Sequence, residues 1–163
     1  MSKVGPALLL DVDGVLNPHD APEPPAGYEE HRYQPGLMWG PEGLRVWLNA
    51  GHGPLLTAFA REHGLELVWA TTWEQQANEW IAPRVGLPAL PVIRLGTGAL
   101  VKRPKVGEWA GDRPLAWIDD GFTELDDEWA RERAAPTLLV PVASHLGLRE
   151  ADLKPIAEWV GQL

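Results

Sequence analysis

The sequence predicts a three-layer α/β fold in which a mostly parallel five-stranded sheet carries helices on both faces. Five short apolar runs recur along the chain, and helical patterns fill the intervals between them. The runs are nearly continuous in hydrophobicity, which is typical of strands covered on both faces. Strands that alternate with helices indicate crossover connections, and crossover connections produce a parallel sheet.

The five expected strands cover residues 7–10, 65–70, 91–95, 115–118 and 137–142. Helices are expected over residues 54–62, 74–85, 104–110, 125–133 and 150–162. In the first of these helices the apolar residues share one face, because they stand at positions 55, 56, 59 and 60. Pro104 falls in a first turn, where its missing N–H is tolerated.

Residues 17–53 interrupt this alternation. Residues 17–36 are rich in Pro, Gly, Glu and His, so we expect a long loop there. Residues 37–39 and 44–48 flank the turn sequence Gly-Pro-Glu-Gly, a pattern that indicates a hairpin. A long insertion in a small domain is usually functional or disordered. We therefore expect a β-hairpin flap that follows the first strand and folds over its end.

Composition limits the classes of function. The 163 residues fit one domain spanning positions 1–163. The net charge of −9 argues against non-specific binding to nucleic acid, which needs a basic face. The lack of cysteine excludes thiolate metal sites and cysteine nucleophiles. The apolar runs are too short for a membrane helix or a signal peptide, so we expect a cytoplasmic protein that does not bind membranes. A homo-oligomer is also compatible with the sequence.

Two of the expected strands end in carboxylates. Asp11 and Asp13, followed by Gly14, come directly after the first strand, and Asp119 and Asp120 follow the fourth. Either pair alone is also compatible with an ordinary solvated turn, because Asp and Gly favour turns. Two such ends on neighbouring strands, however, predict a site for a hard divalent cation.

Polar residues follow two other segments. Thr71 and Thr72 end the second strand, where one hydroxyl can bind a phosphoryl oxygen or cap the next helix. Lys102 and Lys105 flank the start of the helix over 104–110. One lysine can offset the repulsion between a carboxylate nucleophile and an anionic substrate, although basic residues in a loop are often only solvated.

These motifs, in this order, resemble the haloacid dehalogenase-like (HAD) hydrolase superfamily. The resemblance spans residues 8–121 and rests on four segments, namely Asp11-Val12-Asp13-Gly14-Val15-Leu16-Asn17, Val68-Trp69-Ala70-Thr71-Thr72-Trp73, Lys102-Arg103-Pro104-Lys105 and Trp117-Ile118-Asp119-Asp120. It implies a Rossmann-like domain of the capless or small-flap type, because only residues 17–53 are available to cover the site.

The resemblance also implies roles for individual residues. Asp11 corresponds to the nucleophile that becomes an aspartyl phosphate, and Asp13 to the general acid and base. The presence of this second aspartate favours phosphate esters over organohalides as substrates. Gly14 belongs to the turn whose backbone amides bind the phosphoryl group.

The remaining site residues follow in the same way. Thr71 matches the phosphoryl-binding hydroxyl, with Thr72 as the alternative, and Lys102 matches the lysine, with Lys105 as the alternative. The implied cofactor is Mg²⁺, and its expected ligands are Asp11, Asp13 (through its carbonyl oxygen), Asp119 and Asp120.

The predicted function is therefore that of a magnesium-dependent phosphatase acting on a phosphorylated small molecule or macromolecule. Two alternatives use the same fold. One is a phosphate- or metal-binding interaction module with little turnover, and the other is a phosphotransferase whose acceptor is not water.

Overall fold

Four parallel strands form the central sheet, in the spatial order β4-β1-β5-β6. The structure is a computed structural model that describes residues 4–96 and 98–163. The strands are β1 (Ala7–Leu10), β4 (Glu66–Trp69), β5 (Leu115–Asp119) and β6 (Thr137–Pro141). The expected single domain over 1–163 includes residues 1–3 and 97, which lie outside the described residues.

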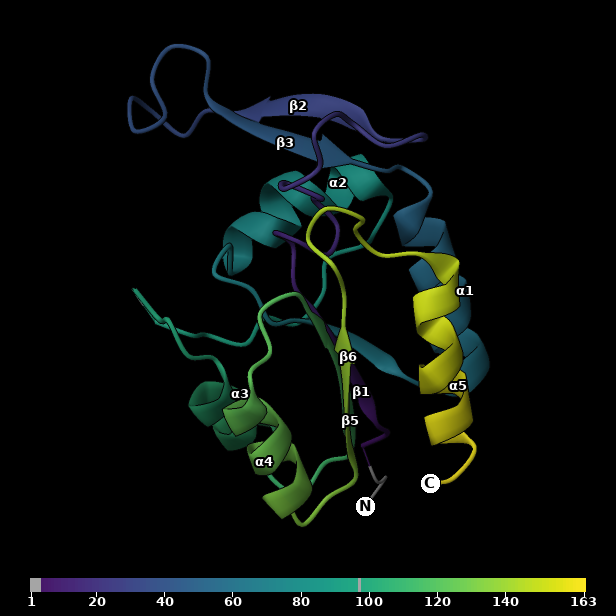
Figure 1. The fold of residues 1–163 in the computed structure, drawn as a ribbon. Helices are drawn as coiled ribbons and strands as arrows, with labels where there is room; N and C mark the ends of the chain where they lie inside the picture. The colour runs from purple at the N-terminus through teal and green to yellow at the C-terminus, as the bar shows by residue number, and fades with distance from the viewer. Residues whose placement is uncertain (1–3, 97) are drawn as a thin grey trace.

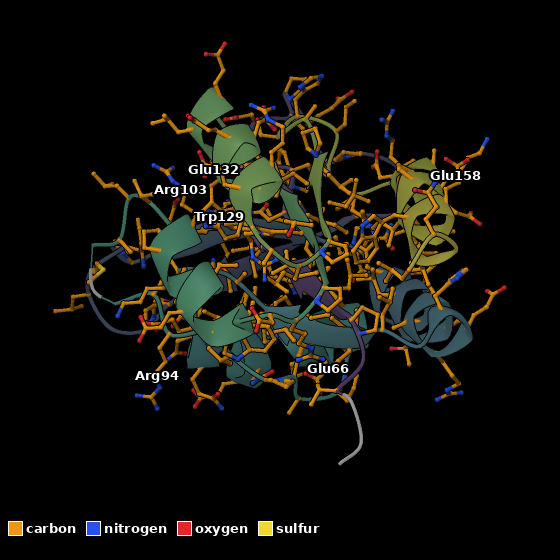
Figure 2. All side chains as sticks on the ribbon, turned by 90° about the horizontal axis from the view of Figure 1, so that it is seen from below. Glu66, Arg94, Arg103, Trp129, Glu132 and Glu158 are labelled. Atoms are coloured by element: carbon orange, nitrogen blue, oxygen red, sulfur yellow. The ribbon has the colours of Figure 1, made fainter. Side chains whose placement is uncertain are left out.

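Helices cover both faces of this sheet (Figure 1). Helices α1 (His52–His63) and α5 (Lys154–Val160) lie on one face, and α3 (Arg103–Ala110) and α4 (Glu124–Glu132) lie on the other. Arg103 and Trp129, labelled in Figure 2, lie on the neighbouring helices α3 and α4. The Nη1 atom of Arg103 lies 3.1 Å from Oδ1 of Asp126, which joins these two helices. The predicted parallel α/β fold is thus confirmed.

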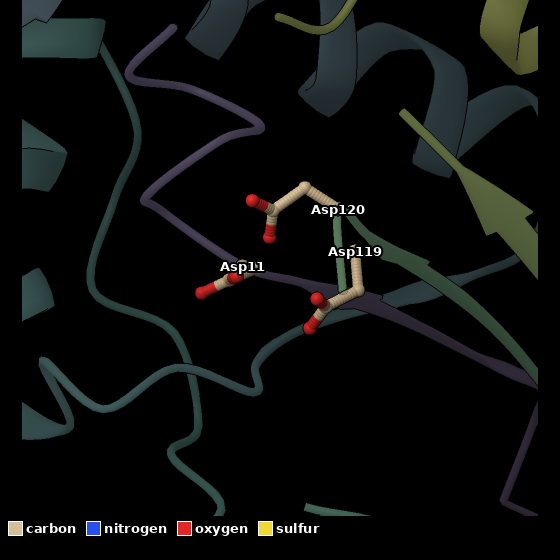
Figure 3. A group of neighbouring side chains, drawn as sticks. All are labelled: Asp11, Asp119 and Asp120. Atoms are coloured by element: carbon tan, nitrogen blue, oxygen red, sulfur yellow. The ribbon is translucent and has the colours of Figure 1, made fainter. Parts of the chain in front are cut away.

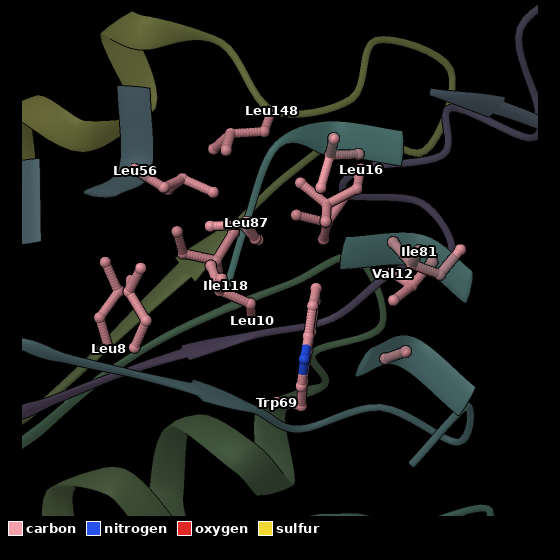
Figure 4. Close-up of a cluster of buried hydrophobic side chains, with 14 of the residues drawn as sticks. Leu8, Leu10, Val12, Leu16, Leu56, Trp69, Ile81, Leu87, Ile118 and Leu148 are labelled. Carbon is pink, nitrogen blue, oxygen red and sulfur yellow. The ribbon is translucent and has the colours of Figure 1, made fainter. Parts of the chain in front are cut away.

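The residues of β1 divide between two cores because alternate side chains of a strand point to opposite faces. Leu8 and Leu10 join the larger core against α1 and α5, which includes Leu56, Ile118 and Leu148 (Figure 4). Ala7 and Leu9 join the smaller core against α3 and α4. All four β1 residues are fully buried, which explains why this strand reads as one continuous apolar run.

The expected strand over residues 91–95 does not form. A single bridge pairs Val92 with Trp69 of β4. Side chains satisfy the neighbouring backbone groups instead: Asn78 bonds both the N–H and the carbonyl of Leu90, and Glu74 accepts the N–H of Leu95. Because Pro91 has no N–H to donate, this segment remains a loop beside the edge of the sheet.

The expected hairpin strand over residues 37–39 is also wrong. Leu44–Leu48 forms β3 as expected, but its antiparallel partner is β2 (Glu29–Tyr33), which lies within the segment expected to be a loop. Residues 34–43 connect the two strands, with positive φ angles at Gly36, Gly40 and Gly43. This two-stranded ribbon lies beyond the carboxyl ends of the central strands (Figure 1).

The expected helix over residues 74–85 is shorter and irregular. A π-helical turn (η1, Ala77–Ile81) leads into α2 (Ala82–Val85). The N–H of Ala82 donates to the carbonyl of Ala77, five residues earlier, and Pro83 has no N–H to continue a regular α-helical pattern. The C-terminal helix likewise begins with a 3₁₀ turn (η2, Glu150–Leu153). Within the described residues, none of the helices combines the length and apolar character needed to cross a membrane.

Candidate active site

The carboxyl ends of β1 and β5 bring three aspartates together (Figure 3). Leu10 pairs with Ile118 in the parallel ladder, and the N–H of Asp11 donates to the carbonyl of Ile118 at 3.2 Å. The residues that follow on the two strands are therefore neighbours. One carboxylate oxygen from each of Asp11, Asp119 and Asp120 lies within 4.8 Å of the others. We call these three residues the acidic cluster.

Lys102, at the amino end of α3, reaches into the acidic cluster. Its Nζ atom lies 2.7 Å from Oδ2 of Asp119 and 3.1 Å from Oδ2 of Asp11. A third bond joins Nζ to the carbonyl oxygen of Ala70, at 3.1 Å, just beyond β4. All three donors of the ammonium group therefore have oxygen partners in the protein, and the lysine ties three strand ends together.

Burial and mutual repulsion shape the ionisation of the cluster. Burial and the nearby charge of Asp119 raise the pKa of Asp11 to about 8, although Lys102 opposes this rise. Burial and Asp119 also raise the pKa of Asp120. Burial disfavours the charge of Lys102, but Asp11 and Asp119 outweigh it and raise the pKa of the ammonium group. One lysine thus leaves the negative charge of the three carboxylates only partly compensated.

The cluster has the donor chemistry that Mg²⁺ prefers. Asp119 uses Oδ2 for Lys102 and Oδ1 for the N–H of Gly121, at 2.9 Å. Asp120, by contrast, forms no ion pair with any described residue. Asp11 and Asp120 therefore offer the hard carboxylate oxygens that a divalent cation needs, and Asp119 can support them directly or through water.

The carbonyl oxygen of Asp13 is the atom expected to bind the metal, whereas its carboxylate lies outside the acidic cluster. Its Oδ1 atom accepts a hydrogen bond from Nδ2 of Asn17 at 3.0 Å, and its Oδ2 atom accepts one from Nε1 of Trp73 at 2.9 Å. Asn17 is itself buried and accepts the backbone N–H of Trp47 of β3 at 3.0 Å. Sequence reasoning gave Asn17 and Trp73 no role, although both stand within the motif segments.

Gly14 lies against the acidic cluster. It has a φ of +81°, and a Cβ atom at this position would overlap the carboxylate of Asp120. Its N–H donates to the carbonyl of Asn17 at 2.8 Å, so this amide is already satisfied within the turn. The glycine therefore allows the turn after β1 to approach the turn after β5 closely.

The two threonines after β4 differ in exposure. Thr71 is 1% exposed, and its Oγ1 atom accepts the N–H of Trp73 at 3.3 Å. Thr72 is exposed and borders the cavities beside the acidic cluster. Glu74 closes this turn with a φ of 46°, a left-handed conformation that is unfavourable for a residue with a side chain. The tight turn places Thr72 and Trp73 beside Asp13.

The two lysines also differ. Lys105 is exposed on α3, and its Nζ atom pairs with Glu108 of the same helix at 3.5 Å. It lines neither of the two cavities beside the acidic cluster. Of the two candidate lysines, the structure brings Lys102 alone into the acidic cluster.

Two cavities meet at Asp13 and Thr72. The first, which we call the charged cleft, has a volume of about 420 Å³ and contains Asp11, Lys102, Asp119 and Asp120. The second, which we call the aromatic groove, has a volume of about 690 Å³. Its walls come from the turn after β1, the β2–β3 ribbon with its connecting loop, and the turn after β4: Asp13, Asn17, His19, Tyr33, Pro35, Met38, Trp39, Leu44, Arg45, Thr72, Trp73 and Gln76.

Comparison with known proteins agrees with this arrangement. Residues 7–153 match the family described as the HAD domain in Swiss Army Knife RNA repair proteins. Searches of curated proteins and of solved structures found no match. The matched region contains every strand found in the described residues and the whole acidic cluster, and membership indicates a hydrolase of the phosphatase type. The chain therefore belongs to this family of HAD domains and, with it, to the haloacid dehalogenase-like superfamily.

Proposed function

We propose that this protein is a magnesium-dependent phosphomonoesterase that works through an aspartyl phosphate on Asp11. The observation that carries the proposal is the position of Asp11, a buried carboxylate beside Lys102, Asp119 and Asp120 at the carboxyl edge of the sheet. Ligands bind at this edge in open α/β sheets. A carboxylate nucleophile divides hydrolysis into two easier steps.

In the first step, a carboxylate oxygen of Asp11 attacks phosphorus and forms the aspartyl phosphate. The bond from phosphorus to the ester oxygen breaks, and Asp13 donates a proton to the departing oxygen. In the second step, Asp13 takes a proton from a water molecule, which attacks phosphorus. Inorganic phosphate leaves and the Asp11 carboxylate is restored. The hydrogen bonds from Asn17 and Trp73 hold the Asp13 carboxyl group in place for both transfers.

The other residues supply charge and position. Lys102 keeps Asp11 and Asp119 oriented and offsets the repulsion between the nucleophile and an anionic substrate. Thr72, which is exposed and lines both cavities, would bind the phosphoryl group through its hydroxyl. Asp11 and Asp120, supported by Asp119, would hold Mg²⁺. When bound, this ion supplies positive charge that screens the phosphate oxygens from the carboxylates.

A phosphorylated small molecule or macromolecule is the substrate in this proposal. Because the family description names RNA repair proteins, a phosphorylated RNA end is a candidate for the macromolecular case. The net charge of −9 requires such a substrate to be held at the site itself rather than by a general basic surface.

The test is hydrolysis of 4-nitrophenyl phosphate with Mg²⁺ or with EDTA by three proteins: wild type, Asp11→Asn and Asp127→Asn. We expect turnover that depends on Mg²⁺ and falls by on the order of 10³-fold in Asp11→Asn, because an amide is not a nucleophile here. Asp127 is an exposed aspartate of α4, so its variant should stay within about twofold of wild type. Equal rates for wild type and Asp11→Asn would exclude Asp11 as the nucleophile.

One observation favours a second candidate, a phosphate- or metal-binding module with little turnover. The Gly14 N–H and all three donors of Lys102 already have partners within the protein. Beryllofluoride, which mimics an aspartyl phosphate, separates the candidates when combined with turnover. A binding module would bind Mg²⁺ but would neither form the beryllofluoride adduct nor release phosphate, whereas an enzyme would do both. Added alcohols would reveal the third possibility, a phosphotransferase, by yielding alkyl phosphates.

A further inference from the structure

The aromatic groove presents ring faces next to Asp13. Tyr33, Trp39 and Trp73 line it together with Met38. Trp39 is 45% exposed and Met38 is 80% exposed, so both offer apolar surface that the fold itself does not bury. Tyr33 and Trp73 are fixed more firmly: their ring centroids lie 4.7 Å apart, and Trp80 stacks behind Trp73 at 5.9 Å with an interplanar angle of 13°.

The position of Asp13 relates this groove to the reaction. Both residues that hold its carboxylate, Asn17 and Trp73, line the aromatic groove, and neither lines the charged cleft. The carboxyl group that protonates the departing oxygen is therefore directed toward the groove. The phosphoryl group lies at Asp11, in the charged cleft, so the rest of the substrate must continue past Asp13.

The groove also differs from the acidic cluster in charge. Apart from Tyr33, its ionisable side chains are Asp13, His19 and Arg45. The Arg45 guanidinium lies 3.8 Å from the centroid of the Trp47 ring and donates to the carbonyl of His19 at 3.3 Å, so it is held at the groove wall. The groove is thus rich in aromatic surface and carries a fixed cation. A flat, electron-rich ring suits such a lining, because rings stack on aromatic faces and interact favourably with a guanidinium group.

We propose that the aromatic groove is the subsite for the leaving group, and that the preferred substrates are phosphomonoesters whose leaving group carries a planar aromatic ring. Trp39, from the connecting loop of the β2–β3 ribbon, closes over the ring, and Trp73 forms the facing wall. This inference rests on the proposed phosphatase function. The shared chemistry is the ring itself, which can come from a free nucleotide, from the terminal nucleotide of an RNA or from a simple aryl phosphate.

The experiment compares kcat/KM for ring-bearing and ring-free monoesters of similar leaving-group acidity. Glycerol phosphate is the ring-free substrate. The ring-bearing arms are a 5′-mononucleotide, a 3′-mononucleotide and short oligoribonucleotides with a 5′- or 3′-terminal phosphate. We expect at least one ring-bearing arm to exceed glycerol phosphate by about tenfold or more, which is the range of stacking on one aromatic side chain. The arm with the highest kcat/KM identifies the source of the ring.

Substitutions in the connecting loop test whether the aromatic groove causes the preference for ring-bearing substrates. Trp39→Ala should lower the ratio of kcat/KM between the best ring-bearing substrate and glycerol phosphate by about tenfold, and Trp39→Phe should restore most of it. Leu37→Ala is the matched control, because Leu37 lies in the same loop, is 93% exposed and lines neither cavity; its ratio should equal that of wild type. A nucleoside without phosphate should inhibit glycerol phosphate hydrolysis, more weakly in Trp39→Ala.

The outcomes separate this inference from the proposed function. If no phosphomonoester is hydrolysed, the proposed function fails. If glycerol phosphate is hydrolysed as well as every ring-bearing substrate, the phosphatase stands and the ring subsite is overturned. The subsite is also overturned if Trp39→Ala retains the wild-type ratio. The subsite is overturned as well if Leu125→Ala, in the charged cleft, lowers the ratio of kcat/KM between ring-bearing substrate and glycerol phosphate while Trp39→Ala leaves it unchanged.

Discussion

The charged cleft and the aromatic groove meet at Asp13 and Thr72, yet they are built in opposite ways. The carboxylates of the charged cleft come from the ends of buried strands, and Asp11 and Asp119 are nearly inaccessible to solvent. The groove is formed largely by the β2–β3 ribbon and its connecting loop, where Met38 and Trp39 remain exposed. The packed core therefore fixes the charged cleft, whereas part of the wall of the aromatic groove is a loop with exposed side chains.

This difference indicates a division of labour. Phosphoryl transfer depends on placing charges accurately, and strand ends in a packed sheet provide such accuracy. Substrate selection depends on surface that can differ between proteins without disturbing the core, and loops provide such surface. We therefore expect substitutions of Lys102 and of the acidic cluster to affect every substrate alike, and substitutions in the groove to change which substrate is preferred.

The largest effect is expected for Lys102→Met. The substitution removes the ammonium group that contacts both Asp11 and Asp119, so kcat should fall by on the order of 10³-fold for all substrates. Lys105→Met provides the control, because Lys105 is exposed and pairs only with Glu108 among the described residues. Steady-state kinetics with two unrelated phosphomonoesters measures both effects. An equal loss in the Lys105 variant would contradict the assignment of the site lysine to Lys102 alone.

Asp13→Asn should give the next largest loss. Without a proton donor, turnover of an alkyl phosphate should fall by on the order of 10²-fold or more. The loss should be smaller for 4-nitrophenyl phosphate, because its leaving group departs without a proton in the first step. Measuring both substrates thus tests the role as well as the importance of Asp13. An identical loss for both would argue against Asp13 as the acid of the first step.

The acidic cluster should also make stability depend on pH when divalent ions are removed. Burial raises the pKa of Asp11 in the folded protein to about 8, above its usual value of 3.8. The folded state therefore binds a proton that the unfolded state releases, so this contribution is complete below about pH 4 and is lost as the pH rises toward 8. The amide of Asp11→Asn does not ionise, so this variant should be more stable than wild type at pH 8, by at most about 5 kcal/mol for a pKa raised from 3.8 to about 8.

Denaturant unfolding in EDTA at pH 5, 6.5 and 8 measures this difference. The stability gap between Asp11→Asn and wild type should widen with pH, and Mg²⁺ should narrow it at pH 8 by binding the wild-type carboxylates. A gap that is constant across this range would mean that Asp11 is already ionised in the folded protein at pH 5.

The same contrast explains what the sequence could reveal. The strand ends were predictable because a buried parallel strand is a continuous apolar run, and Asp11 and Asp119 stand where two such runs stop. The choice between Lys102 and Lys105 was not predictable, because both flank the start of α3 and only the path of the chain decides which one reaches the carboxylates.

The groove was much harder to predict. Strand β2 has the sequence Glu-Glu-His-Arg-Tyr, which lacks the apolar character of a buried strand, and only its contacts through His31 and Tyr33 to Trp80 explain its position. The partner of β3 was expected at residues 37–39, whose apolar side chains are typical of a strand but lie exposed in the connecting loop. Propensity cannot distinguish an apolar residue that completes a core from one that the fold leaves exposed.

A substitution of Trp73 tests the contrast between the charged cleft and the aromatic groove at the point where they meet. Its ring faces the aromatic groove, and its indole N–H bonds Oδ2 of Asp13 at 2.9 Å. Trp73→Phe keeps a smaller aromatic wall and removes the donor, so kcat should fall by about tenfold while most of the preference for ring-bearing substrates stays. Trp80→Phe is the matched control, because Trp80 stacks on Trp73 without contacting Asp13, and its kcat should stay within about twofold of wild type. If Trp73→Phe instead changes substrate preference and leaves kcat intact, the indole serves the groove alone, and Asn17 becomes the residue that positions Asp13.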